Sequence, residues 1–154
     1  MSTRRVLCVI CSGNICRSPY GEGILRKLAD EAGLNVEVFS AGTLGINDRP
    51  AHDHSLSVAS ERAVDLTTHR SQGLDKAVVE RSDVLLCMSP GHVEEIYELF
   101  PDARERTFLY GAYPLVGKDA DDIPDPIGKP IEVFRECFDA IDAAAARILR
   151  ELRA

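Results

Sequence analysis

The sequence predicts a single α/β domain over residues 1–154, built on a four-stranded parallel sheet with helices on both faces. Short apolar runs alternate with helical patterns along the whole chain, which is typical of a parallel sheet. The first run, VLCVIC at residues 6–11, is apolar throughout, as expected of a strand covered on both faces. No repeat, low-complexity stretch or linker divides the chain, and its 154 residues suit one domain.

The individual elements follow from these patterns in chain order. Apolar runs predict four strands, at residues 6–11, 36–40, 84–88 and 107–109. The stretches between and after them predict five helices, at residues 18–32, 51–64, 73–81, 90–100 and 130–152. In the first helix, Pro19 falls in the first turn, where its missing N–H costs nothing, and Gly33 ends the helix. The last helix has an apolar face formed by Val133, Phe134, Cys137, Ile141, Ala144, Ile148 and Leu152.

One long connection stands out between the last strand and the last helix. Residues 110–129 are rich in Gly, Pro and Asp and have no periodic apolar pattern, so they are expected to form a surface loop. Loops of that length are usually either functional or disordered.

Composition and charge narrow the classes of protein. Hydrophobic residues make up 45% and charged residues 28% of the chain, as in ordinary soluble globular proteins. The formal net charge of −7 argues against nucleic acid as the main partner, and no apolar stretch approaches the roughly 18–20 residues that cross a membrane. The N-terminal apolar run is also short for a secretion signal. We expect a cytoplasmic protein with its five cysteines reduced, present as a monomer or weak dimer.

The stretch CSGNICRSP begins at Cys11, the last residue of the first predicted strand, and allows three interpretations. A zinc site would need further ligands at metal-binding spacing, and His52 and His54, two residues apart, do not share a helix face. A structural disulfide between Cys11 and Cys16 is disfavoured in a reducing compartment, although a reversible one would block and protect Cys11. The third interpretation is a loop that binds an oxyanion. We expect no metal and no cofactor.

A phosphate-binding loop after the first strand follows from the chemistry of these residues. Gly and Asn tolerate positive φ, so that successive backbone N–H groups can point inward. The N-terminus of the next helix adds partial positive charge, and Arg17 can close a bidentate fork on two oxygens. The same donors, with the Ser18 hydroxyl, favour the thiolate of Cys11. The loop therefore predicts covalent catalysis of phosphate-ester hydrolysis. Its substrate-binding residues would be Ser12, Gly13, Asn14, Ile15, Cys16 and Ser18.

The motif C-x5-R-S-P, placed after a strand at the start of a chain of this length, resembles that of the low-molecular-weight protein tyrosine phosphatases. The stretches SAGT at 40–43, THRS at 68–71 and DPIG at 125–128 agree, so the resemblance covers essentially the whole chain. It implies a phosphorylated protein as substrate and a phosphocysteine intermediate. Cys11 would be the nucleophile and Arg17 the phosphate clamp.

The resemblance also implies an acid and a set of supporting residues. The family's general acid lies in an Asp-Pro step, so we expect Asp125 to protonate the leaving group and later to activate water, with Asp122 as the other candidate. Asn14 would be held in a strained conformation by hydrogen bonds from Ser40 and His69.

The sequence departs from eukaryotic-type members of the family at the pocket mouth. Ile127 and Gly128 follow the Asp-Pro step in place of aromatic residues, and Leu44 and Ile46 stand where another aromatic wall often occurs. The mouth is therefore expected to be aliphatic and wide, as in bacterial members, some of which act on phosphoarginine. Those members tend to carry threonine where this chain has Ile15. We therefore expect phosphotyrosine as the substrate and keep protein-arginine phosphatase activity as the alternative.

Two other classes share some of these features. Arsenate reductases resemble this fold and loop, but they pass oxidation to a further pair of cysteines. Here only Cys87 lies in the corresponding region, so arsenate reduction is the less favoured alternative. A phosphate-binding module without catalysis would leave the joint presence of Cys11, Arg17 and Asp125 unexplained.

Overall fold

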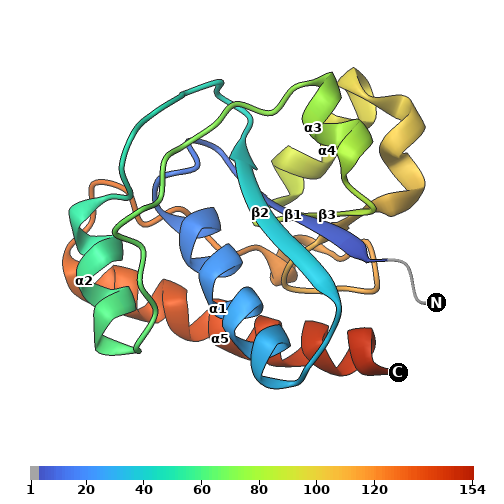
Figure 1. Ribbon diagram of the computed structural model, residues 1–154. Helices are drawn as coiled ribbons and strands as arrows, with labels where there is room; N and C mark the ends of the chain where they lie inside the picture. Colours follow the sequence, from blue (N-terminus) through green and yellow to red (C-terminus); the bar gives the residue numbers. More distant parts are fainter. Residues whose placement is uncertain (1–3) are drawn as a thin grey trace.

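The computed structural model describes residues 4–154, which contain an all-parallel four-stranded sheet of order β2-β1-β3-β4 (Figure 1). The strands are β1 (Arg5–Cys11), β2 (Val36–Gly42), β3 (Val84–Cys87) and β4 (Thr107–Leu109). The helices are α1 (Arg17–Glu31), α2 (Asp53–Glu61), α3 (Lys76–Arg81), α4 (Pro90–Leu99) and α5 (Ile131–Arg153), with short 3-10 helices η1 (Pro101–Arg106) and η2 (Asp119–Asp121). The predicted fold class is confirmed. Because the strands are parallel, the segments that follow their carboxyl ends meet at one edge of the sheet.

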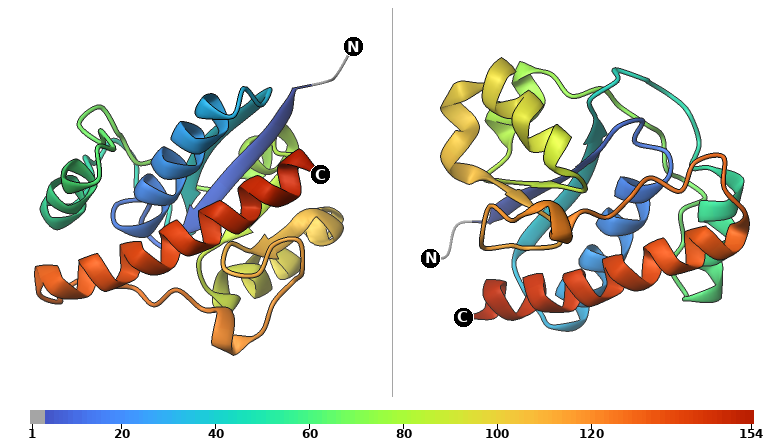
Figure 2. Two further views of the ribbon diagram at one scale, coloured as in Figure 1. Left: turned by 90° about the horizontal axis from the view of Figure 1, so that it is seen from below. Right: turned by 180° about the vertical axis from the view of Figure 1, so that it is seen from behind.

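Different helices cover the two faces of the sheet (Figures 1 and 2). α1, α2 and α5 pack on one face, whereas α3 and α4 pack on the other. Strand β1 supplies both cores in alternation: Leu7 and Val9 belong to the first, and Cys8 and Ile10 belong to the second. This two-sided burial explains why the first apolar run of the sequence is unbroken.

Helix α5 crosses its face of the sheet and packs against α1 (Figure 2). The ring of Tyr20 in α1 stacks on the ring of Phe138 in α5, with centroids 4.0 Å and planes 9° apart. The Tyr20 hydroxyl donates a hydrogen bond to Asp142 at 2.5 Å, and Asp142 also pairs with Arg62 at 2.8 Å. These contacts hold the body of α1, the helix that begins at the end of the CSGNICR loop.

Two helices are shorter than predicted, for local reasons. The helix expected at 51–64 begins after His52, whose ring accepts a hydrogen bond from the helix N-terminus. It ends before Ala63, whose φ of 59° lies outside the helical region. The helix expected at 73–81 begins later because Asp75 caps its N-terminus. Side-chain caps and single backbone turns therefore determine these boundaries.

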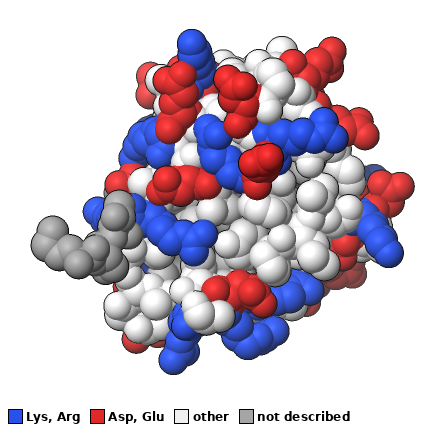
Figure 3. All heavy atoms as spheres, turned by 90° about the vertical axis from the view of Figure 1, so that its right-hand side faces the viewer, with Lys and Arg blue, Asp and Glu red and all other residues white. Residues whose placement is uncertain are grey.

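Charged side chains of both signs mix on the molecular surface. On the face drawn in Figure 3, Lys and Arg side chains are interspersed with Asp and Glu, with uncharged side chains between them. None of the helices within residues 4–154 combines the length and the apolarity that crossing a membrane requires.

Candidate active site

The loop from Cys11 to Arg17 leaves the carboxyl end of β1 and runs into α1, with the end of β2 directly beside it. Cys11 pairs with Gly42 in the parallel ladder. Beyond Gly42, backbone N–H groups donate to the carbonyls of Cys11 and Ser12 at 3.1 and 2.9 Å. A Cβ on Gly42 would lie 2.7, 2.8 and 2.9 Å from backbone atoms of the loop. The glycine therefore lets the strand approach the loop closely.

Asn14 holds the loop in a strained turn. Its φ of 58° places it in the left-handed region, and it is fully buried. Its side-chain nitrogen donates to the hydroxyls of Ser18 and Ser40 at 2.7 and 2.9 Å, and its side-chain oxygen accepts from the backbone N–H of Gln72 at 2.9 Å. The Nε2 of His69 lies 2.7 Å from its carbonyl oxygen, which accepts the hydrogen. All the polar groups of the Asn14 side chain are thus used to hold the turn.

The contact with Ser40 runs in the opposite direction to the prediction. Ser40 was expected to donate to Asn14, but it accepts from the Asn14 amide. The reason is a carboxylate on α1: the Ser40 hydroxyl donates its own hydrogen to Glu22 at 2.6 Å. Glu22 therefore orients the serine that supports the strained turn.

The sulfur of Cys11 faces two donors from the start of α1. Because Asn14 donates to the Ser18 oxygen, the hydrogen of that hydroxyl is left for the Cys11 sulfur, 3.0 Å away. The backbone N–H of Ser18 points at the same sulfur from 3.5 Å. Cys11 is only 2% exposed. Two donors at a helix N-terminus are the conditions that favour a thiolate.

Cys16 shares the loop but differs in its environment. It is buried, and burial, with smaller effects from Asp125 and Cys11, raises the pKa of its thiol to about 12. Cys16 is therefore a neutral thiol at physiological pH. All five cysteines within residues 4–154 are unpaired, and burial raises the pKa of Cys137 on α5 to about 12 as well.

The guanidinium of Arg17 is buried and forms hydrogen bonds with residues of several segments. Its Nη1 donates to the Ser89 hydroxyl and to the Ile123 carbonyl, each at 2.8 Å. Its Nη2 lies 3.4 Å from the Ser12 hydroxyl and 3.7 Å from an oxygen of Asp125. Its Nε is buried and has no hydrogen-bond partner among residues 4–154. An unpaired buried donor on such a fixed fork indicates a place for an oxyanion.

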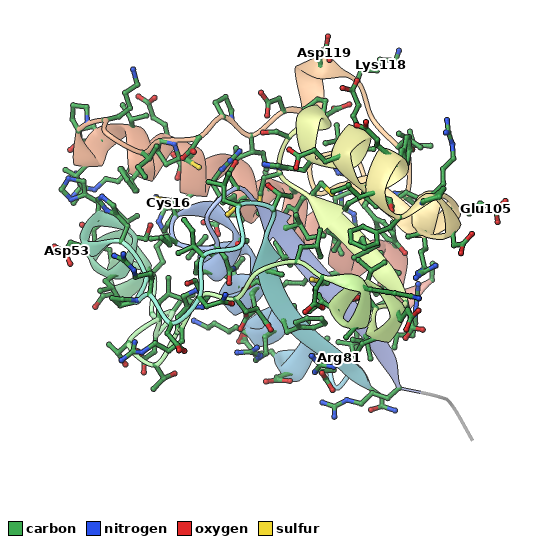
Figure 4. All side chains as sticks on the ribbon, turned by 90° about the horizontal axis from the view of Figure 1, so that it is seen from above. Cys16, Asp53, Arg81, Glu105, Lys118 and Asp119 are labelled. Atoms are coloured by element: carbon green, nitrogen blue, oxygen red, sulfur yellow. The ribbon has the colours of Figure 1, made fainter. Side chains whose placement is uncertain are left out.

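The two candidate acids have different surroundings. The Asp125 side chain is 37% exposed and lies on the loop before α5, where it faces Arg17 and accepts from the Ile127 backbone N–H at 3.1 Å. Asp122 instead accepts a 2.5 Å hydrogen bond from the Ser89 hydroxyl. Asp119, earlier in the same loop, projects outward at the edge of the molecule, away from Cys16 (Figure 4). Of these three carboxylates, Asp125 therefore faces Arg17, Asp122 binds Ser89 and Asp119 points away from the site.

Ser89 and His92, at the start of α4, also reach the loop, and the sequence analysis missed both. The Ser12 hydroxyl lies 3.0 Å from Nε2 of His92, whose ring is buried. Burial, and then the charge of Arg17, lower the pKa of His92 to about 4, so the ring is neutral at physiological pH. Topology could have indicated this segment, because it follows the carboxyl end of β3. No comparable feature of the sequence indicates that Glu22 and Gln72 belong to the site.

The set of groups has a clear chemical meaning. A thiol with donors aimed at its sulfur, a buried arginine with a free donor and a carboxylate at the rim suit attack on a tetrahedral phosphate. Within residues 4–154, no cluster of three or more His, Cys, Asp or Glu side chains could hold a metal ion. Fold and site together define the class of cysteine-dependent phosphatases with a Cys-x5-Arg loop.

Comparison with known proteins identifies the family. The model of low molecular weight phosphotyrosine protein phosphatases matches residues 6–154, and the chain belongs to that family. It is 31% identical over 144 residues to the low molecular weight protein-tyrosine-phosphatase Etp of Escherichia coli K12, covering 94% of this chain and 92% of Etp. It is 34% identical over 144 residues to a protein-arginine-phosphatase of Geobacillus stearothermophilus, covering 94% and 93%. Vibrio vulnificus Wzb in complex with benzylphosphonate superposes with a TM-score of 0.85 at 34% identity, over 97% of this chain and 99% of Wzb.

Proposed function

We propose that this protein hydrolyses phosphotyrosine-type phosphomonoesters on proteins through a phosphocysteine intermediate. The observation that carries the proposal is the buried Nε of Arg17, which has no partner in the described part of the chain, beside a loop whose Cys11 sulfur receives two hydrogen-bond donors. An oxyanion bound there would satisfy the arginine and lie next to the nucleophile.

In the first step, the Cys11 thiolate attacks phosphorus. A sulfur–phosphorus bond forms while the bond from phosphorus to the tyrosine oxygen breaks, and Asp125 gives its proton to that oxygen. Arg17 and the backbone N–H groups of the loop stabilise the charge on the other phosphate oxygens. The 3.7 Å separation of Arg17 and Asp125 supports this division of roles, because it brings the acid to the rim of the anion site.

In the second step, water attacks the phosphocysteine. Asp125, now a carboxylate, takes a proton from the water as its oxygen bonds to phosphorus. The sulfur–phosphorus bond breaks, inorganic phosphate leaves and Cys11 returns as a thiolate. The hydrogen bond from Ser18 stabilises the departing sulfur in the same way as it stabilises the attacking one.

The mouth of the site supports an aryl phosphate as the main substrate. Leu44 and Ile127 are exposed, at 67% and 56%, and Ile15, within the loop, packs against the core. These aliphatic side chains offer an apolar wall that suits an aromatic ring. The Vibrio vulnificus neighbour holds benzylphosphonate, an aromatic phosphonate. The relative from Geobacillus stearothermophilus makes phosphoarginine on proteins the second candidate substrate.

A thiol relay of the arsenate reductase kind has less support. Cys87 is fully buried in β3, and burial raises the pKa of its thiol well above the ordinary value. We also propose that the protein acts in the cytoplasm as a monomer or weak dimer, in keeping with five unpaired cysteines within the described residues.

Steady-state hydrolysis of aryl phosphates tests the proposal. Cys11→Ser should abolish turnover of p-nitrophenyl phosphate, and Asp125→Asn should lower kcat by ~10²–10⁴. The loss in Asp125→Asn should be larger for phenyl phosphate, because phenoxide needs the proton more than p-nitrophenoxide does. Asp119→Asn is the matched control: the carboxylate belongs to the same loop but points away from the site (Figure 4).

Phosphotyrosine and phosphoarginine peptides, assayed in parallel, separate the two substrate classes. A higher kcat/KM for the phosphotyrosine peptide is the expected result, and the reverse order would assign the protein to the arginine phosphatases. A reduced wild-type protein that hydrolyses neither would contradict the proposed function.

A further inference from the structure

We infer that His92 is a positioning residue for Arg17: one imidazole holds both serines, Ser12 and Ser89, that contact the guanidinium. The inference rests on the proposed function, because it takes Arg17 to be the phosphate clamp. The hydrogen bonds of the His92 ring go to Ser12 and to Ser89, so we take it to act on Arg17 through these two neighbours.

The hydrogen bonds of the ring define its tautomer. The backbone N–H of Ser89 points at Nδ1 from 3.2 Å, so Nδ1 accepts and carries no hydrogen. In the neutral ring the hydrogen is then on Nε2, which donates to the Ser12 hydroxyl oxygen at 3.0 Å. The ring is 4% exposed, which disfavours the charged form. His92 thus has one acceptor and one donor, each directed at a different serine.

The hydrogen bond from Nε2 of His92 determines whether the Ser12 hydroxyl presents a lone pair or its own hydrogen to Arg17. Both neighbours of the Ser12 oxygen, Nε2 of His92 and Nη2 of Arg17, carry hydrogens, so this oxygen accepts from each. Without the histidine the hydroxyl is free to rotate and to turn its own hydrogen toward the guanidinium. The bond from His92 therefore keeps a lone pair facing the arginine.

The acceptor Nδ1 of His92 helps to position the other side of the Arg17 guanidinium, because it fixes Ser89. It ties down the backbone of Ser89, whose hydroxyl accepts from Nη1 of Arg17 at 2.8 Å and donates to Asp122 at 2.5 Å. With both serines held, the guanidinium plane has one orientation, in which Nε is left unpaired for a phosphate oxygen. Small misplacements of such a group are costly for catalysis.

Two substitutions at His92 separate positioning of Arg17 from capping of α4. His92→Gln keeps a donor near the place of Nε2, and His92→Asn keeps an acceptor near the place of Nδ1. If the bond to Ser12 is the important one, His92→Asn lowers kcat/KM for p-nitrophenyl phosphate by about tenfold, the equivalent of one hydrogen bond, and His92→Gln retains most of it. The reverse order would mean that His92 only caps the helix and would overturn the inference.

Binding of inorganic phosphate, measured by calorimetry, gives a readout that does not depend on turnover. The affinity should fall about tenfold in His92→Asn and little in His92→Gln. His54→Gln is the matched control, since that histidine packs against the Phe134 ring and should leave both readouts at wild-type values. A wild type that binds phosphate but hydrolyses nothing would overturn the proposed function alone, and the binding arm would still test His92.

A double-mutant cycle with Ser12→Ala shows whether His92 acts through the loop serine. In the Ser12→Ala background, His92→Asn should have little further effect on kcat/KM, because the bond it removes is already gone. Effects that add in full would mean that the two residues work independently and would overturn the inference.

Discussion

At the scale of single residues, the polar side chains of the site form a branched network of hydrogen bonds that starts at the Asn14 amide. Asn14 donates to two serines, Ser18 passes its own hydrogen to the sulfur of Cys11, and Ser40 passes its hydrogen to Glu22. Each branch ends on an acceptor, a sulfur in one case and a carboxylate in the other. The network is therefore fully satisfied when the sulfur is a thiolate, the form that attacks phosphate.

Ser18→Ala tests this network at its last link. Removing the hydroxyl deprives the Cys11 sulfur of its 3.0 Å donor, and it also removes one of the two serine acceptors of the Asn14 amide. We expect alkylation of Cys11 by iodoacetamide at neutral pH and hydrolysis of p-nitrophenyl phosphate each to slow by about tenfold. Ser60→Ala, an exposed site on α2, is the control. An unchanged alkylation rate would show that the Ser18 hydroxyl does not contribute to the reactivity of Cys11.

At the scale of elements, the site depends on the backbone hydrogen bonds that join the end of β2 to the loop after β1. Strand β2 is two residues longer than its apolar run predicts, and the extra residues bring Gly42 level with Cys11. Pairing continues into the loop through the N–H groups that follow the strand. The second strand is therefore also the wall against which the strained turn at Asn14 is built.

Gly42→Ala should disturb the loop while the fold survives. The added methyl group would lie 2.7–2.9 Å from loop backbone atoms, so one of the two segments must shift. A shift of about 1 Å at Cys11, the proposed nucleophile, would lower kcat by ~10². Gly91→Ala is the matched control because nothing lies within 4 Å of its added Cβ. Circular dichroism and kcat, measured together, check the prediction, and a fully active Gly42→Ala would contradict it.

At the scale of the whole molecule, packing of α5 against α1 holds the first turns of α1 in place. The stacked pair Tyr20 and Phe138 lies at its centre, fully buried. Phe138→Ala should lower the free energy of unfolding by ~3–5 kcal/mol, since it removes a large buried ring and leaves a cavity. Urea denaturation measures this loss. The exposed neighbour Glu136→Ala should change it by only about 0.5 kcal/mol, and equal effects of the two would refute the role of the ring.

The buried ring of His92 also predicts a pH dependence of global stability. Its pKa is about 4 in the folded protein and near 6.5 in the unfolded chain. Between these values the unfolded chain binds a proton that the folded protein does not, so the free energy of unfolding falls as the pH drops through this window. Above pH 6.5 the term is constant.

The variant His92→Gln isolates this contribution. The difference in unfolding free energy between wild type and variant should be constant above pH 6.5 and should shift against the wild type as the pH falls from 6.5 toward 4. Urea denaturation at several pH values on both sides of 6.5 provides the measurement. A difference that does not change with pH would mean that the ring titrates alike in both states.

Local patterns in the chain were sufficient to predict most elements and the chemistry of the loop. The four strands follow from short apolar runs, and the C-terminal helix follows from its apolar stripe, because burial on a pleated or helical surface has a fixed period. The Gly-Asn pair, the thiol and the arginine lie within seven consecutive residues, so their joint meaning could be interpreted without knowing the fold. Asp125 was selected among the loop carboxylates because Pro126 follows it and because the family resemblance points to an Asp-Pro step.

Tertiary structure alone decided which distant groups surround that loop. Ile123 and Ser89 hold Arg17 from 106 and 72 residues away in the chain, and His92 reaches Ser12 across 80. Such contacts leave no periodic mark in the sequence, because each needs one side chain at one place. The direction of the Ser40 bond also depended on Glu22, a neighbour in space only. The sequence by itself therefore determined the elements and the candidate loop, whereas the orientation of Arg17, the proposed phosphate clamp, depended on the parallel strands that bring their carboxyl ends to one edge.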